Sequence, residues 1–192
     1  MTPLPISDLD EILSVNEQLD RRLDGTRVLV TGGTGFFGRW MLEAWAHATD
    51  RLRLDRRVVV VSRDPDRFLA SAPHLAGRRD IEFVRGDIAD DVDVDGTFDA
   101  CIHAATAASL ALSIDEPRSM FDTVVRGTAN VLDALSASAT PVPLLLTSSG
   151  ATFEGRNLAE RNGAGVGFFS ARVVGDTSRL QGLSTTAPPG FV

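Results

Sequence analysis

Three glycines stand at the spacing that a phosphate-binding turn requires. Gly33, Gly35 and Gly38 fit the pattern G-x-G-x-x-G, directly after the apolar run 28–30 and before an amphipathic stretch. In such a turn the backbone approaches a pyrophosphate, and the following helix points its free N–H groups at the phosphates. We expect Gly33 to permit the tight turn, Gly35 to admit the pyrophosphate, and Gly38 to let the helix pack on the strand. The pattern predicts a dinucleotide-binding turn.

Ligands of parallel sheets bind beyond the carboxyl ends of the strands. Residues that directly follow the other predicted strands are therefore also candidates for binding. The residues expected to bind the cofactor are Thr31, Gly32, Gly33, Thr34, Gly35, Phe36, Phe37, Gly38, Ser62, Arg63, Asp87, Ile88, His103, Ala104, Ala105 and Thr147. Asp87 would accept a hydrogen bond from the adenine amino group, and Ala104 and Ala105 would let a ribose lie close to the backbone. A lone histidine in this place is more often structural than catalytic, so we assign His103 a packing or hydrogen-bonding role.

The residues after the strand at 58–61 bear on the choice between NAD and NADP. An acidic residue there would bond the ribose 2′-hydroxyl, whereas an arginine accommodates a 2′-phosphate. The chain has Ser62, Arg63 and Asp64 in this order. Arg63 favours NADP, while Asp64 would favour NAD if its carboxylate turned inward. The alternative interpretation of Arg63 is a solvated loop charge.

The hydrophobic period predicts alternating strands and helices. We expect strands at 27–31, 58–61, 81–84, 98–102 and 141–146. We expect helices at 6–24, capped by Ser7 and Asp10, and from the glycine turn onwards, with Phe37, Met41, Ala44 and Ala48 on one apolar face, and a short helix and loop at 64–76. A long helix is expected at 117–138, and the residues on its apolar face are Phe121, Val124, Val125, Thr128, Val131, Leu132 and Leu135. This order indicates an α/β fold with a doubly wound parallel sheet. We divide the chain into an N-terminal helix (1–25), a dinucleotide-binding domain (26–155) and an irregular tail (156–192) with at most one short element.

Composition argues against several functions. The formal net charge of −7 disfavours nucleic acid as a partner, and no apolar run is long enough to span a bilayer. Cys101 is the single cysteine, which suits a reducing compartment, so we expect a cytoplasmic protein. The stretch from Asp91 to Gly96 matches the first half of a calcium loop, but Ile102 stands where the bidentate glutamate belongs, so we expect no metal site.

Taken together, five segments resemble the extended short-chain dehydrogenase/reductase superfamily, in its NAD-dependent epimerase/dehydratase branch. They are Thr31–Gly38, similar to the family's Thr-Gly-x-x-Gly-x-x-Gly turn; Gly86–Asp87, similar to its adenine-contacting Gly-Asp; His103–Ala105, similar to its segment after strand four; Val125–Leu132, similar to its Asn-Val-x-Gly-Thr-x-Asn-Val-Leu helix; and Ser148–Phe153, similar to its Ser-Ser-x-x-Val-Tyr stretch. The resemblance covers about residues 26–155. It implies a Rossmann-like sheet, NAD or NADP as the cofactor, and a nucleotide sugar as the substrate.

In that family a serine or threonine, a tyrosine and a lysine carry out the chemistry, and the serine position falls on Ser149 or its neighbour Ser148. The chain contains no tyrosine, and all 19 of its Lys-or-Arg residues are arginine, so the family's Tyr-x-x-x-Lys pair is absent. Val124 stands where the family helix usually has asparagine, and Glu154 where a glycine usually follows the aromatic residue. The cofactor half of the family pattern is present and the catalytic half is not.

Three hypotheses follow from these residues. The first is a C-terminally truncated nucleotide-sugar epimerase or dehydratase, with an inherited cofactor site and absent or strongly reduced activity. The second is a non-catalytic dinucleotide-binding module that regulates or pairs with a partner, with helix 117–138 as a homodimer interface. The third is a complete enzyme that uses Ser149 with His103 or Glu154.

Overall fold

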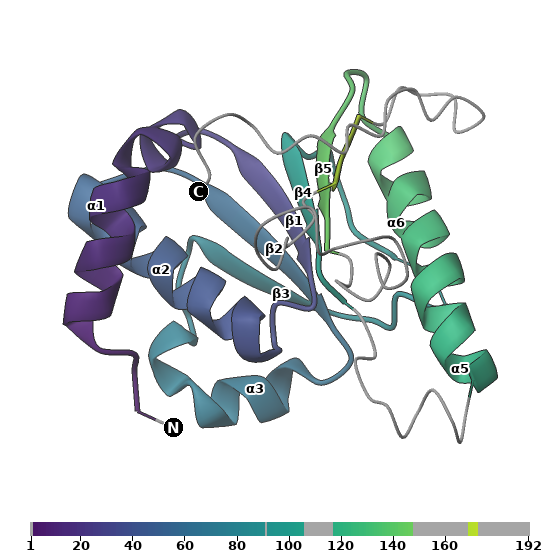
Figure 1. Cartoon of the computed structure of the whole chain (residues 1–192), viewed down its shortest axis with the longest axis horizontal. Coiled ribbons are helices and arrows are strands. Elements are labelled where there is room, and N and C mark those ends of the chain that lie inside the picture. Colours follow the sequence, from purple (N-terminus) through teal and green to yellow (C-terminus); the bar gives the residue numbers. More distant parts are fainter. Residues whose placement is uncertain (1, 91, 106–116, 148–168, 173–192) are drawn as a thin grey trace, which may run out of the picture.

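The computed structural model describes residues 2–90, 92–105, 117–147 and 169–172 (Figure 1). Its helices are α1 (Ile6–Arg22), α2 (Phe36–Leu52), α3 (Pro65–Ser71), α5 (Pro117–Phe121) and α6 (Gly127–Ser136), with a 3-10 turn η1 (Pro73–Leu75) and a π-helical turn η2 (Asp122–Arg126). Its strands are β1 (Arg27–Thr31), β2 (Arg57–Ser62), β3 (Ile81–Arg85), β4 (Ala100–His103), β5 (Pro143–Leu146) and β6 (Phe169–Arg172).

The strands form one sheet in the order β3-β2-β1-β4-β5-β6. Strands β1 to β5 are parallel, and β6 runs antiparallel to β5. The strand order reverses between β1 and β4, which is the place where doubly wound sheets bind their ligands. The predicted α/β fold with a doubly wound parallel sheet is confirmed. Strand β6 is a short antiparallel element within the region that was predicted to be irregular.

Each face of the sheet carries its own hydrophobic core, because alternate residues of a strand point to opposite faces. On one face Val60 of β2 lies in a buried cluster with Leu42 of α2 and Phe68 of α3. On the other face Val59 lies in a buried cluster with Val131 of α6. Figure 1 shows the same division, with α1, α2 and α3 on one side of the sheet and α5 and α6 on the other.

The buried side chain of Arg56 joins helix α1 to helix α2. The side chain of Arg56 is 0% exposed and pairs with Asp20 of α1 at 2.8 Å. Its guanidinium also donates to the carbonyl of Trp45 at 3.0 Å and to Thr49 Oγ1 at 3.0 Å, and it lies 3.8 Å from the centroid of the Trp45 ring. Arginine suits this position because its planar fork can bond several acceptors while stacking on an aromatic face.

The start of α1 differs from the prediction. Pro5 is the N-cap and makes no side-chain cap bond, while Ser7 lies inside the first turn and donates to Asp8 Oδ1 at 3.1 Å. Asp10 lies 2.8 Å from His47 Nε2 of α2 instead of capping the helix. The predicted cap by Ser7 and Asp10 is therefore wrong, because the helix begins before Ser7 and places its hydroxyl beyond the N-cap position.

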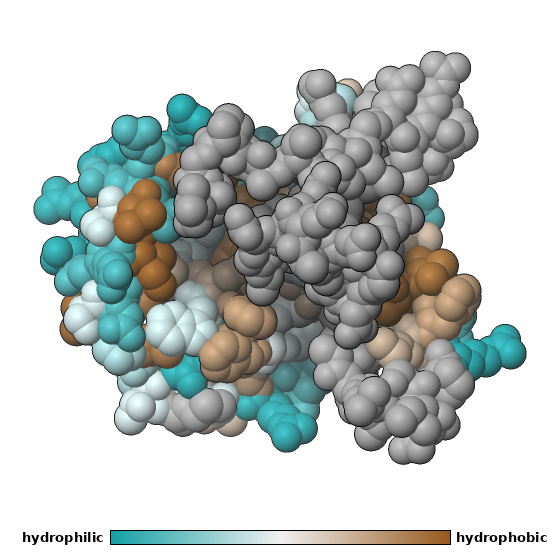
Figure 2. All heavy atoms as spheres, viewed as in Figure 1, coloured by the Kyte–Doolittle hydropathy of each residue, from teal (hydrophilic) through white to brown (hydrophobic). Residues whose placement is uncertain are grey.

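The predicted helix at 117–138 is interrupted, since η2 separates α5 from α6 and the helix ends at Ser136. Val131 is buried against the sheet as expected. However, Phe121, Val124 and Val125 are 61%, 39% and 48% exposed, so the predicted apolar face meets the core only in its second half. Figure 2 shows hydrophobic residues gathered on the side where Figure 1 places α5 and α6.

Two strands begin later than predicted. β4 begins at Ala100 and β5 at Pro143, although Phe98 and Val142 ahead of them are only 3% and 2% exposed. An apolar run indicates burial, and burial does not require pairing in a ladder. Within the ranges that the structure describes, no helix combines the length and apolarity needed to cross a membrane, and no three His, Cys, Asp or Glu side chains gather to hold a metal.

Candidate functional site

The glycine turn after β1 packs directly on the backbone that follows β4. Gly32 has a φ of +75°, and a Cβ there would lie 2.5 Å from the carbonyl carbon of Ala104 and 2.7 Å from the amide nitrogen of Ala105. Both the left-handed conformation and the close approach require glycine. The expectation that Gly33 permits the tight turn is wrong, because Gly32 has the positive φ. Gly33 is needed instead for packing, since a Cβ there would meet Val60 Cγ1 at 2.7 Å.

The start of α2 has the properties of an anion-binding site. Gly35 is the N-cap, no side chain caps the helix, and the first turn contains no acidic residue. Among the described residues, a Cβ at Gly35 would meet only the carbonyl oxygen of Gly32, at 3.3 Å. Gly38 holds the helix against the turn, since its Cβ would lie 2.3 Å from the carbonyl carbon of Gly33. Free N–H groups and the positive end of the helix dipole, with no acidic residue in the first turn, together fit the pyrophosphate of a dinucleotide.

Polar and aromatic side chains frame this turn. Thr34 Oγ1 lies 3.1 Å from Ser62 Oγ, at the end of β2. This bond joins the turn to the strand end at which an adenosine ribose is expected. Phe36 and Phe37 are 75% and 76% exposed, and their ring centroids lie 5.3 Å apart, edge to face.

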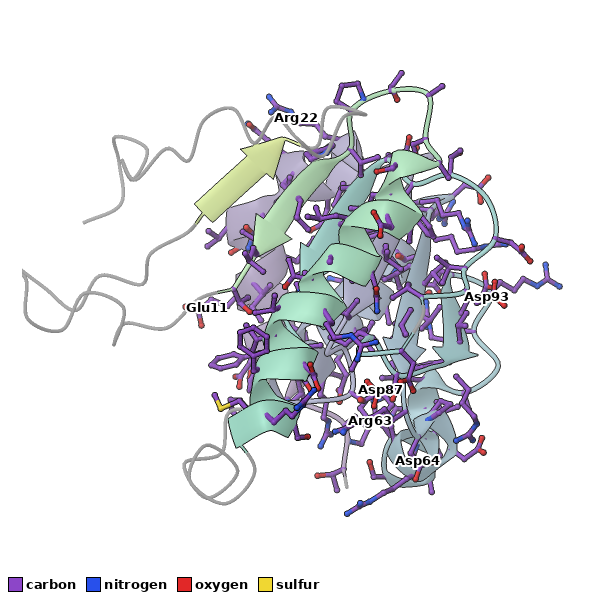
Figure 3. The ribbon with its side chains drawn as sticks, turned by 90° about the vertical axis from the view of Figure 1, so that its right-hand side faces the viewer. Glu11, Arg22, Arg63, Asp64, Asp87 and Asp93 are labelled. Carbon is purple, nitrogen blue, oxygen red and sulfur yellow. The ribbon has the colours of Figure 1, made fainter. Side chains whose placement is uncertain are left out.

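The two charges after β2 differ in how they are engaged. Asp64 is the N-cap of α3, and its Oδ1 accepts from the N–H of Arg67 at 3.1 Å. Arg63 is exposed, and among the residues that the structure describes its guanidinium has no ion-pair partner. Figure 3 shows Arg63, Asp64 and Asp87 at the same end of the sheet. At this end of the sheet, therefore, one oxygen of the Asp64 carboxylate is engaged by a main-chain N–H, whereas the Arg63 guanidinium has no ion-pair partner among the described residues.

Asp87 and Ile88 lie in the turn after β3. Asp87 Oδ1 accepts from the N–H of Ala89 at 3.0 Å, and its carbonyl oxygen accepts from the N–H of Asp90 at 3.1 Å. Ile88 is 6% exposed and contributes to the core on the α6 side of the sheet. The Asp87 carboxylate is thus held at the carboxyl end of a strand, where a group that reads the adenine amino group would have to lie.

His103, the last residue of β4, contacts both the end of β1 and helix α6. Its Nδ1 lies 2.6 Å from Thr31 Oγ1, and its Nε2 lies 3.0 Å from Thr128 Oγ1. The Thr128 hydroxyl donates to the carbonyl oxygen of Val124 in η2, at 2.6 Å. Its oxygen must therefore accept from the Nε2–H of His103, and Thr31 must donate to Nδ1.

The imidazole of His103 is neutral in this arrangement. It is 3% exposed, and burial lowers its pKa to about 4. Because both ring nitrogens are engaged and the neutral form is retained, the side chain fits the structural role that the sequence predicted. Thr128 is the partner that sequence reasoning missed, since it was assigned only to the apolar face of its helix. A hydroxyl within an otherwise apolar stripe was the available signal.

The remaining strand end comes from β5. The N–H of Thr147 donates to the carbonyl oxygen of His103 at 3.1 Å, and its hydroxyl donates to the same oxygen at 3.3 Å. The structure thus brings the predicted cofactor residues together from the ends of β1, β2, β3, β4 and β5. Ser149, Ser148 and Glu154 lie outside the described residues.

The strand order, its reversal between β1 and β4, and the glycine turn at that reversal define a fold of the Rossmann type, the class to which many dinucleotide-binding proteins belong. Comparison with known families then gives a narrower assignment. The chain belongs to the NAD dependent epimerase/dehydratase family, whose model matches residues 28–162. The family resemblance expected from the sequence is confirmed.

Individual relatives agree with this assignment. CDP-paratose 2-epimerase of Salmonella typhi is 31% identical over 115 residues, which cover 57% of this chain and 32% of that protein. dTDP-glucose 4,6-dehydratase of Streptomyces niveus is 35% identical over 115 residues, which cover 57% of this chain and 34% of that protein. The chain spans about a third of the length of these curated relatives. The chain also matches the structure of an epimerase from Methanothermobacter thermautotrophicus at 23% identity and a TM-score of 0.56. The match covers 76% of this chain and 41% of that chain, which supports the fold.

Proposed function

We propose that this chain binds a nicotinamide dinucleotide for the epimerisation or dehydration of a nucleotide sugar, in which oxidation at C4 by hydride transfer precedes the second step. The observation that carries the proposal is the glycine turn. It closes on Ala104 and Ala105 through Gly32, and among the described residues no side chain caps the N-terminus of α2 at Gly35. The names of the relatives, a CDP-paratose epimerase and a dTDP-glucose dehydratase, support nucleotide sugars as the substrate class.

Each part of the site would hold one part of the cofactor. The main chain at Gly35 and the first N–H groups of α2 would hold the pyrophosphate, and Asp87 would hold the adenine amino group. The small residues Ala104 and Ala105 would let a ribose lie against the backbone. When bound, a nicotinamide dinucleotide takes up and returns a hydride, and Ser149 would donate a hydrogen bond to the substrate oxygen.

We further propose that NADP is preferred over NAD. The support is the contrast between Arg63, which is exposed and without an ion-pair partner among the described residues, and Asp64, whose carboxylate caps α3. An arginine at this position can pair with the 2′-phosphate that only NADP carries. Ser62, where a ribose-binding acid would otherwise stand, bonds to Thr34 instead.

Turnover by the chain as printed is expected to be absent or strongly reduced. It contains neither tyrosine nor lysine, so the proton transfer that the family assigns to Tyr-x-x-x-Lys has no candidate residue in it. Loss of a general acid or base costs about 10²–10⁴-fold in rate. Cofactor binding does not depend on that pair alone, because the pyrophosphate and adenosine contacts come from other residues.

A second candidate function is a non-catalytic dinucleotide-binding module that pairs with a partner. The exposed apolar side chains Phe121, Val124 and Val125 favour it, since they lie within five residues of one another in α5 and η2. We propose a homodimer through residues 117–138 as the specific form, which light scattering of the full chain would reveal as a doubled mass. The single cysteine, Cys101, is buried and free, and we propose a cytoplasmic location on this basis.

The test of the proposed function is thermal unfolding of the full chain with and without NADPH or NADH. A ligand that binds only the native state must raise the melting temperature, so both should raise it and NADPH should raise it more. The comparison variant is Gly35→Asp, because the φ of −80° at Gly35 suits any residue and the added carboxylate would repel a pyrophosphate. Its Cβ would meet the carbonyl oxygen of Gly32 at 3.3 Å, so that carbonyl must move by a few tenths of an ångström. That variant should melt near the wild-type temperature without ligand and show no shift with either one. A wild-type chain that neither dinucleotide stabilises would contradict the proposal.

A further inference from the structure

The turn after β3 is held from outside by helix α6. The side-chain amide of Asn130 donates one hydrogen bond to the carbonyl oxygen of Ile88 at 2.8 Å and a second to the carbonyl oxygen of Asp90 at 2.9 Å. An asparagine amide has two N–H donors, and both are used on this single turn. The partners are 42 and 40 positions apart in the chain, so these bonds join two distant segments of the sequence.

A second contact supports the same turn from the same helix. Gly127 lies three residues before Asn130 and therefore on the same side of α6. A Cβ at Gly127 would lie 2.7 Å from Cδ1 and 3.0 Å from Cγ1 of Ile88, so the Ile88 side chain occupies the space that a larger residue would need. Helix α6 thus contacts the turn at three points, which are the side chain of Ile88 and the carbonyl groups of Ile88 and Asp90.

Gly86 and Asp87 lie between the end of β3 and these contacts, and Asp87 is the one with a polar side chain. Its own bonds are local, to the N–H groups of Ala89 and Asp90 within the turn. A short turn held only by local bonds opens readily, whereas bonds to a packed helix raise the cost of opening. The orientation of the Asp87 carboxylate therefore depends on whether Ile88 and Asp90 stay attached to α6.

We propose that Asn130 is a positioning residue for adenine recognition: by holding the carbonyl groups of Ile88 and Asp90, it fixes the carboxylate of Asp87 where that group can read the adenine amino group. The inference rests on the proposed dinucleotide function. It adds a residue on a different element, 43 positions from Asp87 in the chain (130 − 87), to the adenine end of the site.

The experiment compares two ligands that differ at one edge of the base, where the amino group is replaced by a carbonyl oxygen and N1 gains a hydrogen. NADH carries the adenine amino group, and reduced nicotinamide hypoxanthine dinucleotide carries an oxygen in its place. Dissociation constants for both are measured by fluorescence titration on the full chain, for the wild type, Asn130→Ala and Asn130→Ser. Asn16→Ala is the matched control, because the Asn16 amide also donates to a main-chain carbonyl, that of Ile12 at 2.8 Å, but within α1.

The wild type and Asn16→Ala should both bind NADH about tenfold more tightly than the hypoxanthine form, as expected for one hydrogen bond to a carboxylate. Asn130→Ala should bring that ratio close to one, mainly by weakening NADH binding. Asn130→Ser keeps one donor on a shorter side chain and should give an intermediate ratio. A general loss of stability would weaken both ligands alike, so the ratio reports on positioning.

Each other outcome has a distinct meaning. A wild type that binds neither ligand contradicts the proposed function itself. A wild type that binds both equally, or an Asn130→Ala variant that keeps the wild-type ratio, overturns the positioning role while leaving dinucleotide binding intact. If both Asn130 variants are unfolded by circular dichroism where Asn16→Ala is folded, Asn130 serves the stability of the fold and the inference is likewise overturned.

Discussion

Gly32 and Ala104 meet main chain to main chain, so that a Cβ on Gly32 would lie 2.5 Å from both the carbonyl carbon and the carbonyl oxygen of Ala104. The contact joins the turn after β1 to the segment after β4, at the place where the strand order reverses. Neither partner is the end of a flexible side chain, so neither can move away cheaply. The direct backbone contact therefore sets how closely the two walls of the proposed cofactor site can approach.

This contact predicts a large effect of Gly32→Ala on stability. The variant combines a left-handed backbone with a backbone clash and should lose about 2–4 kcal/mol of unfolding free energy. Gly25→Ala is the matched control, since Gly25 has a φ of +72° but nothing within 4 Å of its would-be Cβ. It should lose only about 1–2 kcal/mol, the cost of the left-handed conformation. Urea unfolding measures both, and equal losses would show that the approach to Ala104 is not restrictive.

Removing the charge of Arg63, which follows β2, should reduce the preference for NADPH over NADH. Arg63→Ala should weaken NADPH binding by about tenfold, as expected for the loss of one charge-assisted bond, and leave NADH binding nearly unchanged. Arg22→Ala removes the same charge far from the site, and Figure 3 shows Arg22 and Arg63 at opposite ends of the molecule. Titration calorimetry with both cofactors decides the matter. If Arg63→Ala weakened both cofactors to the same extent, Arg63 would not read the 2′-phosphate.

The buried imidazole should make stability depend on pH in the acid range. The pKa of His103 falls from its ordinary value of 6.5 to about 4 in the folded chain, so between these values the unfolded chain binds more protons. Unfolding free energy should therefore be highest above pH 6.5 and decrease as the pH falls towards 4, by about 3 kcal/mol from this group. His103→Gln keeps a donor and an acceptor without the titration. Denaturant unfolding across this range should show a shallower slope for the variant, and identical slopes would refute the assignment.

The buried arginine should be required for the attachment of α1. Arg56→Ala leaves Asp20 without its partner and should cost about 3–5 kcal/mol of unfolding free energy, as for other broken buried ion pairs. The control is Arg21→Ala, because Arg21 pairs with Glu17 at 2.7 Å on the exposed side of the same helix. Its loss should cost less than about 1 kcal/mol. Thermal and urea unfolding would measure both, and comparable losses would mean that Arg56 does not anchor the helix.

Much of the fold could be predicted from local patterns. The apolar run in β2 indicated a strand buried on both faces, and the structure divides Val59 and Val60 between the two cores. The glycine spacing after β1 indicated the turn, although Gly38 lies against the backbone of that turn and not, as was expected, against the strand. The same patterns failed at boundaries. The helical period did not reveal the π-turn within 117–138, because one inserted residue barely alters the spacing of apolar side chains.

By itself, then, the sequence determined the parallel sheet, the position of the glycine turn and the family, since each depends on residues close together in the chain. Only the tertiary structure decided that Gly32 carries the positive φ, because its neighbour Ala104 belongs to another strand end. The same holds for the pairing of His103 with Thr128 and of Asn130 with the turn after β3. Hydrogen bonds between residues tens of positions apart depend on how the layers pack, and no local period in the sequence records that packing.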